Sequence, residues 1–422
     1  MQHRTRWRIA LSLLPWVACG PQGDDLATID SAAVTSQALH ATDAPRAGAA
    51  AESAAIGGDK EVLVATAPHA MCTLRGEGTA GTITVWADDV GLVHLWAPRT
   101  RTGETYALDC VESDDTATHT LDLAAPSASF RTAPAAPSPK RRSRPALADP
   151  EHANQSTLIA QDYPPKPNPE KAPGAYKRWL DVVTVPMEIV ETPAKNLGVT
   201  FGPATNFGSG SWGGVQLDAP GTRYVVADGR FTTPEFSPSG SSSHTSLWVG
   251  VGNKVIIQAG VQYATVGSVK VYQTWYEYFP VQLQAQDAAI PVSPGQDLYI
   301  WAWEGDAQCN PGLGHTGWGC FSIANTTTGL QTATIQVQNP ANTFTGDSAE
   351  AIVERTPPTT PIASWTTPIQ VSFDAWADSM QGHDHVSDPF INWTLANPSG
   401  QTMVSTDVLS SDTVSFTYVR SD

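Results

Sequence analysis

Short runs in which apolar and polar residues alternate follow one another almost without interruption from residue 196 to residue 422. Runs of this kind with Gly, Pro and Asn at their junctions are typical of an antiparallel β-sandwich. We therefore predict an all-β fold, in which residues 196–422 form two bent antiparallel sheets of the concanavalin-like kind. The runs include SWGGVQLD, YVVADGRFTTP, HTSLWVGVGN, KVIIQAGVQY, SVKVYQTWYEYFP, DLYIWAWEG and QTATIQVQ.

The residues before this sandwich divide into segments of different composition. Alternating runs such as EVLVATA, TITVWA and LVHLWA predict a small β-sandwich domain at residues 59–126. The basic, Pro-rich stretch at residues 127–195 predicts an extended linker or a propeptide. Residues 20–58 are rich in Ala, Asp, Ser and Thr without periodicity, and we expect them to form a flexible tether.

The first nineteen residues have the features of an export signal. Basic residues precede an apolar run from Ile9 to Val17, which is too short to span a membrane. The run ends in Val-Ala-Cys, so Cys19 is a candidate for the lipid-modified residue of a bacterial lipoprotein, with ordinary cleavage near Ala18 as the alternative. We expect an exported protein that is secreted or held at the outer membrane or cell surface by this lipid alone.

The cysteine count agrees with an oxidising compartment. Five cysteines are present, and setting Cys19 aside leaves an even number. Pairing of sequence neighbours predicts the disulfides Cys72–Cys110 and Cys309–Cys320.

The charge balance excludes two classes of partner. The formal net charge is −17, which argues against nucleic acids and anionic membrane surfaces as partners. From residue 200 onward, six Lys and Arg residues stand against eighteen Asp and Glu residues. So few basic groups suit a protein that works at low pH, because acid then builds up little positive self-repulsion. Simple solubility is the alternative explanation.

Several catalytic chemistries find no support in the motifs. No Gly-x-Ser-x-Gly nucleophile motif occurs, and the paired cysteines leave no free thiol for catalysis. The pair His383 and His385 resembles half of a metal site, but no third ligand is evident, and we expect no metal and no cofactor. Glu350 and Glu354 would lie roughly 13 Å apart along a strand, beyond the roughly 5 to 9.5 Å of a glycosidase pair.

Six motifs, in order, resemble those of the eqolisins, the glutamic peptidases. The resemblance covers residues 211–419, about half of the chain. The motifs are SWGGVQL, GRFTTP, LWVGVGN, IIQAGV, TWYEYFP and AEAIVE.

The resemblance implies a β-sandwich with a catalytic Gln and Glu on the concave face of one sheet. The matching residues are Gln258 in IIQAGV and Glu350 in AEAIVE. A carboxylate can take a proton from water and return it to the leaving nitrogen, while an amide N–H donates to the oxyanion and does not titrate in acid. The acidic residue that the family has four places after its glutamine is Gln262 here.

Large amphipathic rings on the predicted strands indicate a cleft for a polymer. We expect Trp212, Trp248, Trp275 and Glu277 to contact a protein or peptide substrate, and we expect the chain to act as a monomer. A lectin-like sandwich that binds polysaccharide without catalysis is the rival hypothesis, and an inactive family member is a third.

Overall fold

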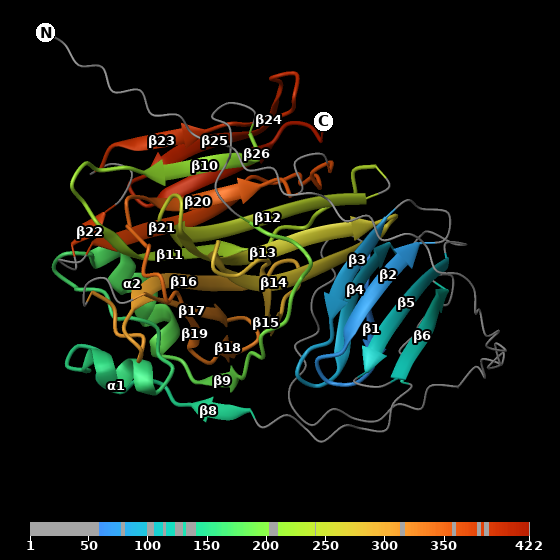
Figure 1. Ribbon diagram of the computed structural model, residues 1–422, viewed down its shortest axis with the longest axis horizontal. Coiled ribbons are helices and arrows are strands. Elements are labelled where there is room, and N and C mark those ends of the chain that lie inside the picture. Colours follow the sequence, from blue (N-terminus) through green and yellow to red (C-terminus); the bar gives the residue numbers. More distant parts are fainter. Residues whose placement is uncertain are drawn as a thin grey trace, which may run out of the picture. The chain divides into compact units, whose positions relative to one another are not determined.

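The computed structural model describes residues 59–76, 81–98, 105–112, 115–122, 130–131, 141–201, 210–240, 242–312, 317–356, 360–377, 381–383 and 388–421. In these residues the chain is nearly all β, and most strands pair antiparallel (Figure 1). The predicted export signal, the predicted tether and Cys19 lie outside the described residues. No helix in the described part of the chain is long and apolar enough to cross a membrane.

The first sheet joins C-terminal and N-terminal strands. Its order is β23-β10-β20-β12-β13-β14-β4-β1-β7, with β15 also paired to β14. The strands are β23 (Phe390–Trp393), β10 (Trp212–Leu217), β20 (Ala349–Glu354), β12 (Ser242–Val251), β13 (Ile256–Val266), β14 (Val269–Phe279), β15 (Gln286–Pro291), β4 (Leu92–Pro98), β1 (Asp59–Ala65) and β7 (Phe130–Arg131).

The second sheet faces the first. Its order is β24-β25-β26-β21-β11-β16-β17-β18-β9-β8, with β19 paired to β17 and β22 paired to β21. The strands are β24 (Leu395–Ala396), β25 (Thr402–Ser410), β26 (Thr413–Tyr418), β21 (Ile369–Ala377), β11 (Tyr224–Thr232), β16 (Asp297–Gly305), β17 (Trp318–Asn325), β18 (Leu330–Thr332), β9 (Met187–Val190), β8 (Arg142–Arg144), β19 (Ile335–Gln338) and β22 (Gly382–His383).

The main core lies between these two sheets. Alternate residues of each strand point into it, because successive side chains of a strand leave opposite faces. Val249 and Val261 of the first sheet and Ile300 and Phe373 of the second belong to this core, and each is at most 1% exposed. The predicted antiparallel β-sandwich is confirmed.

The N-terminal strands form a smaller third sheet of order β3-β2-β5-β6, with β3 (Thr82–Trp86), β2 (Met71–Gly76), β5 (Thr105–Glu112) and β6 (Asp115–Asp122). The predicted disulfide Cys72–Cys110 is confirmed and links β2 to β5. The apolar side chains of this region share a core with Val266 and Val269, at the turn of the β13–β14 hairpin. This arrangement differs from a free-standing small domain, because the hairpin of the sandwich supplies part of the core.

Residues 141–190 differ from the expected extended linker. They contain β8, α1 (Gln155–Ala160), α2 (Pro173–Val183) and β9, and both strands extend the second sheet. Ala175 and Val182 of α2 pack against Trp301 and Trp303 on the outer face of that sheet. The physical reason is the apolar spacing within α2, which gives the helix one buried face despite the Pro-rich sequence before it. The domain boundaries themselves remain a prediction.

A buried guanidinium fixes α2 to the second sheet. Arg178 forms ion pairs with Asp228 of β11 at 3.4 Å, with Asp412 at 2.8 Å and with Asp374 of β21. The Arg178 side chain is 8% exposed, so these charges interact largely away from water. The three carboxylates compensate the cost of burying the arginine, and the helix is thereby held in one place.

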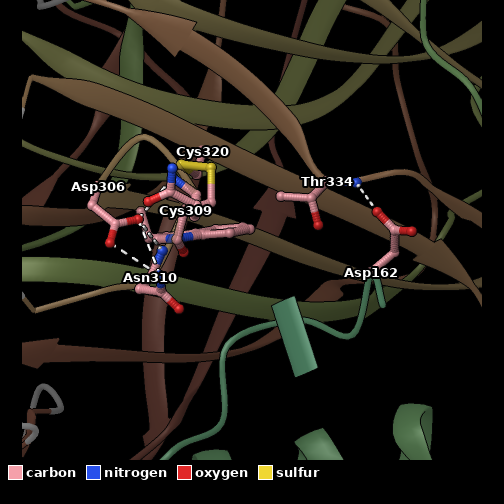
Figure 2. Close-up of a disulfide and its surroundings, with 8 residues drawn as sticks. Asp162, Asp306, Cys309, Asn310, Cys320 and Thr334 are labelled. Carbon is pink, nitrogen blue, oxygen red and sulfur yellow. Dashed lines mark hydrogen bonds between the residues drawn. A yellow bond between two sulfur atoms is a disulfide. The ribbon is translucent and has the colours of Figure 1, made fainter. Parts of the chain in front are cut away.

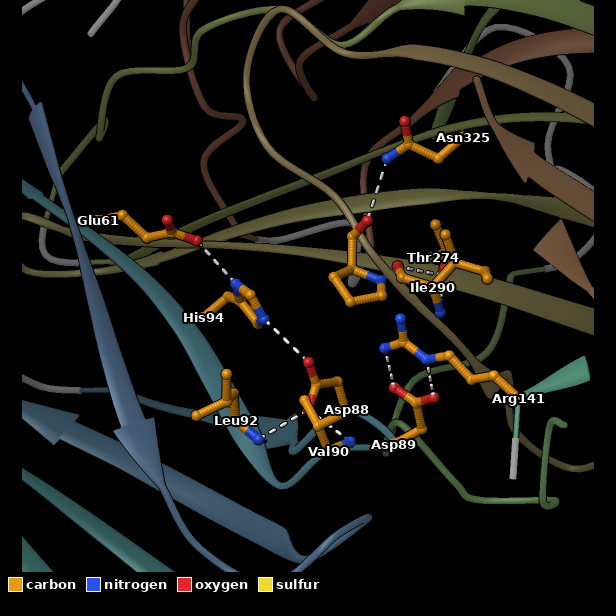
Figure 3. Close-up of polar contacts among 11 residues, drawn as sticks. Glu61, Asp88, Asp89, Val90, Leu92, His94, Arg141, Thr274, Ile290 and Asn325 are labelled. Atoms are coloured by element: carbon orange, nitrogen blue, oxygen red, sulfur yellow. Dashed lines mark hydrogen bonds and ion pairs between the residues drawn. The ribbon is translucent and has the colours of Figure 1, made fainter. Parts of the chain in front are cut away.

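Charged contacts also connect residues 141–190 to the N-terminal strands. Arg141 donates two hydrogen bonds to Asp89, at 2.6 and 2.7 Å, in the turn between β3 and β4 (Figure 3). Nearby, His94 contacts Glu61 at 2.7 Å and Asp88 at 3.2 Å. Although burial alone would lower it, these two carboxylates raise the pKa of His94 to about 9.

The second predicted disulfide, Cys309–Cys320, is also confirmed (Figure 2), and both cysteines share an apolar cluster with Ile159 of α1. Trp303 donates from its indole N–H to the Cys309 carbonyl at 2.8 Å, and Asp306 accepts the backbone N–H of Asn310 at 2.9 Å. Residues 306–310 are therefore held next to β16 and β17 by the disulfide and by local hydrogen bonds.

We predict that Arg178→Met lowers the free energy of unfolding by about 3–5 kcal/mol, because it leaves buried carboxylates without their cation. Chemical denaturation measures this value. The control is Arg75→Met, which removes an exposed ion pair with Asp109 and should cost no more than about 1 kcal/mol. Equal effects of the two substitutions would contradict the prediction.

Candidate active site

The face of the first sheet that points away from the main core collects the polar residues of its central strands. In β13, Ile257, Ala259 and Val261 enter the core, so Gln258 and Gly260 point to the other face. The register of the neighbouring strands is continuous, so each residue on this face has a partner directly beside it on the next strand.

One row of partners crosses five strands and contains both predicted catalytic residues. Its order is Glu277, Gln258, Gly250, Glu350 and Gln216. Strands lie about 4.8 Å apart, so the Cα atoms of Gln258 and Glu350 are about 10 Å apart, on one face. Because Gly250 stands between them and has no side chain, the space between the amide and the carboxyl group stays open to both.

The next row is aromatic. Its order is Trp275, Gly260, Trp248, Ile352 and Gly214, and it continues to Trp393. At Gly260 a Cβ atom would lie 2.3 Å from the Leu247 carbonyl oxygen and 2.6 Å from Trp248 Cβ, so only glycine fits. The tryptophans thus stand directly beside the row of Gln258 and Glu350.

The predicted tryptophans are fixed by hydrogen bonds and ring contacts. Trp248 donates from its indole N–H to Glu354 at 2.8 Å, and Trp275 donates to the Ser246 hydroxyl at 3.0 Å. The ring of Trp212 meets that of Trp248 edge-on, with centroids 5.1 Å apart. The three rings are each at most 2% exposed.

Residues 195–201 of the same chain cover part of this face. Phe201 stacks on Trp275, with ring centroids 4.0 Å apart, and its backbone N–H donates to Glu277 at 3.0 Å. Gln258 donates from Nε2 to the Phe201 carbonyl oxygen and, at 2.8 Å, to Glu277. Further along, a cavity of about 310 Å³ is lined by Leu197, His244 and residues of β3 and β13.

Comparison with known proteins identifies the C-terminal half of the chain. Residues 210–418 match the sequence model of the peptidase A4 family. This part of the chain is a member of the peptidase A4 family. The chain is therefore a glutamic peptidase, a hydrolase of peptide bonds, which favours the enzyme over the lectin-like alternative. A search of curated proteins finds no match.

Solved structures of eqolisins are similar to the chain. Scytalido-glutamic peptidase with a peptide-based transition-state analogue shares 20% identity at a TM-score of 0.40, over 50% of this chain and 98% of that one. SCP-B, an eqolisin in complex with the tripeptide Ala-Ile-His, shares 19% identity at a TM-score of 0.39, over 50% of this chain and 98% of that one. Aspergilloglutamic peptidase from Aspergillus niger shares 23% identity at a TM-score of 0.34, over 42% of this chain and 99% of that one. The family assignment comes from the sequence match.

Burial shifts the acid–base properties of this peptidase site. Burial raises the pKa of Glu350 well above its usual range, more than the neighbouring Ser348 side chain lowers it. Burial likewise raises the pKa of Glu277 to about 9, and it lowers the pKa of His244 to about 4. In this covered state both carboxyl groups favour the neutral form, and so does the imidazole.

The structure brings the predicted site residues together on one face: Gln258, Glu350, Trp212, Trp248, Trp275 and Glu277. Their roles in catalysis and substrate binding remain predictions. Sequence reasoning missed His244, Gly250 and the covering residues 195–201. A signal for the last was present, because Leu197, Val199 and Phe201 alternate as in a strand at the start of the predicted sandwich, although no predicted strand included them.

We predict that Gly250→Ala lowers peptide hydrolysis about a hundredfold, because misplacing catalytic groups by about 1 Å has effects of that size. The added Cβ would lie 2.9 Å from the Ile257 carbonyl oxygen and 3.0 Å from Gln258 Cβ. The control, Gly319→Ala, crowds the Tyr278 ring at 2.7 Å on the core side. It should cost about 1–3 kcal/mol of stability and retain activity. Activity losses of the same size in both variants would contradict the idea that Gly250 keeps the space between Gln258 and Glu350 open.

We predict that stability falls as the pH rises from about 5 to 9. The raised pKa of Glu277 means that the folded state holds this proton more tightly than the unfolded chain does, so its contribution is complete in acid and is lost toward pH 9. His244 acts in the opposite direction, since its lowered pKa removes stability below about pH 6.5. Denaturation across this range should show a smaller decline for Glu277→Gln than for wild type or for the exposed control Glu191→Gln. A loss of stability in Glu277→Gln as large as that of the wild type would refute the prediction.

Proposed function

We propose that the chain is an exported, acid-acting endopeptidase in which Glu350 and Gln258 activate water and stabilise the oxyanion. The observation that carries the proposal is the hydrogen bond from Gln258 Nε2 to a backbone carbonyl oxygen, that of Phe201. An oxyanion donor makes the same contact with the carbonyl that is attacked. An amide keeps its donor at every pH at which the protein is folded, so this role suits acidic conditions.

Glu350 supplies the proton transfers in this proposal. Its two carboxylate oxygens are buried and have no hydrogen-bond partner among the described side chains and backbone groups. A water molecule between Glu350 and the substrate carbonyl would give its proton to the carboxylate as its oxygen attacks the carbonyl carbon. The same carboxyl group then protonates the leaving amine, so the site returns to its starting state after each peptide bond is cut.

Glu277 orients the glutamine. Its carboxyl group accepts a hydrogen bond from Gln258 Nε2 and thereby turns the NH₂ group, and not the amide oxygen, toward the carbonyl. It also accepts a backbone N–H, that of Phe201, as it would from a bound peptide. Trp212, Trp248 and Trp275 would form the apolar wall along which the peptide lies.

The two disulfides support export of the protein, and its buried acidic side chains support activity at acidic pH. Two disulfides form in oxidising compartments, as outside the cytoplasm. The pKa of Asp287 is raised by burial to about 7, as that of Glu277 is raised to about 9, so acid stabilises the folded state. Lipid attachment at Cys19 and free secretion are both compatible with this proposal.

We predict that Glu350→Gln abolishes hydrolysis, because the amide keeps the shape but cannot move the proton. Gln258→Ala should lose about a hundred- to a thousandfold in rate, the typical effect of removing one oxyanion donor. The matched control is Glu354→Gln, which keeps an acceptor for the Trp248 indole and should be milder. The measurement is cleavage of denatured protein and of a fluorogenic peptide by the purified chain across pH 3 to 7.

The wild-type rate should fall at the acid end of this range, where the base becomes protonated. Resistance to inhibitors of aspartic peptidases separates this enzyme from a contaminant. Near-normal activity in Glu350→Gln or in Gln258→Ala would overturn the assignment of the dyad. Inactivity of the wild type at every pH, with the covering residues removed by added protease, would favour an inactive family member.

A further inference from the structure

Residues 195–201, Lys-Asn-Leu-Gly-Val-Thr-Phe, pair like an additional strand with the residues at the start of β15, and their last residue, Phe201, lies on the active-site face. The Leu197 N–H donates to the Ala285 carbonyl at 2.8 Å, and the Ala285 N–H donates to the Val199 carbonyl at 2.7 Å. The Asp287 N–H donates to the Lys195 carbonyl at 2.8 Å. A peptide that binds by adding a strand makes backbone hydrogen bonds of this kind and inserts alternate side chains into the surface.

The end of this segment makes substrate-like contacts. Phe201 is fully buried, and its ring lies on Trp275 and 6.1 Å from the His244 ring, measured between centroids. Its backbone N–H donates to Glu277, and its carbonyl accepts from Gln258. Both backbone groups of one residue are thus held by the polar row that contains Glu350.

The N-terminal strands hold the segment from its other side. Trp86 of β3 donates from its indole N–H to the Asn196 carbonyl at 3.0 Å. The Lys195 ammonium group lies 4.8 Å from the centroid of the Trp86 ring and also donates to the His69 carbonyl oxygen. The segment is therefore enclosed between the third sheet and the active-site face, and Leu197 is 3% exposed.

We propose that residues 195–201 are an internal inhibitor that lies where the substrate peptide binds, so that the chain is inactive until this segment leaves the active-site face. The proposal rests on the proposed function of Gln258 and Glu350. The acid–base state agrees with it: a general base must be ionised, whereas the pKa of Glu350 is raised by burial in the covered protein. Hydration of the uncovered face would return that pKa toward the ordinary value of about 4.3.

The same contacts define the class of substrate. A peptide that replaces the segment would bind with an aromatic side chain between Trp275 and His244 and with the carbonyl of that residue at Gln258. Such a peptide competes with the segment, so its apparent dissociation constant equals the intrinsic constant divided by the fraction of chains in which the segment is displaced.

Gly198 offers a substitution that weakens only the segment. Its φ of +77° is a conformation in which residues with side chains are strained, and Val is among the least tolerant. Gly198→Val should therefore raise the initial rate of peptide hydrolysis by about tenfold. Gly400→Val is the matched control, because Gly400 has the same φ of +77° in a turn and nothing lies within 4 Å of its added Cβ. It should leave the initial rate unchanged.

A binding measurement separates this proposal from the catalytic one. In full-length chains that carry Glu350→Gln, a fluorescent Lys-Asn-Leu-Gly-Val-Thr-Phe amide should bind about tenfold more tightly when Gly198→Val is added. Phe201→Ala, which removes the ring from Trp275, is the second variant if Gly198→Val fails to fold. Fluorescence anisotropy gives both dissociation constants.

The outcomes are distinct. Tighter peptide binding in the Gly198 or Phe201 variant, and not in the Gly400 control, supports the internal inhibitor. Tighter binding without hydrolysis by any chain with intact Glu350 supports the inhibitor and removes the catalytic assignment. Equal binding and equal initial rates in wild-type and segment variants would overturn the internal inhibitor, whatever the dyad variants show.

Discussion

The unbroken antiparallel register of β14, β13, β12, β20 and β10 is the constraint on which the site depends. Side chains alternate between faces, so a shift of one residue in any of these strands would send its polar groups into the main core and its valines to the active-site face. The core therefore fixes the register: Val249, Val261 and Val353 are buried between the sheets only in the observed pairing. The position of Gln258 relative to Glu350 is a consequence of apolar packing on the opposite side of the same sheet.

Glycine has two roles on this face. Gly260 lets the backbone of β13 lie close to Trp248 of β12. Gly250 leaves space between the side chains of Gln258 and Glu350. The first is a matter of fit, since a Cβ would collide with backbone atoms. The second is a matter of access, since a side chain there would separate the amide from the carboxyl group. The strands of one sheet thus supply the side chains of the proposed site.

The outer face of the second sheet shows how the rest of the chain uses similar aromatic residues differently. Trp301 and Trp303 project outward from β16, as the alternation predicts, but they pack under α2 and do not line a cleft. Arg178 and its three aspartates fix that helix over them. Aromatic side chains on a strand therefore indicate a contact surface, while the identity of the partner depends on residues far away in sequence.

The strands and the sandwich could be predicted, because strand alternation is local and is visible in single runs of sequence. The disulfides followed from pairing sequence neighbours, and the shared face of Gln258 and Glu350 followed from the resemblance to the eqolisins. The helices within residues 141–190 could not, because Pro-rich composition concealed an apolar spacing of only eleven residues in α2. The stacking of Phe201 on Trp275 could not be predicted either, because no predicted strand included Phe201 and Trp275 lies more than seventy residues later in the sequence. Contacts between residues so far apart in sequence depend on tertiary packing, and local sequence patterns do not predict them.

The β13–β14 hairpin carries a consequence for the order of assembly. Its turn completes the core of the N-terminal strands, and Trp96 of β4 pairs with Lys270 of β14 across a long stretch of chain. Contacts between residues so distant in sequence carry a large loop-closure entropy and form late in folding. The N-terminal strands, although synthesised first, have no complete core until the hairpin exists. The sandwich must therefore fold before the N-terminal strands that enclose residues 195–201. The active-site face is then formed before the proposed inhibitor segment is enclosed on it.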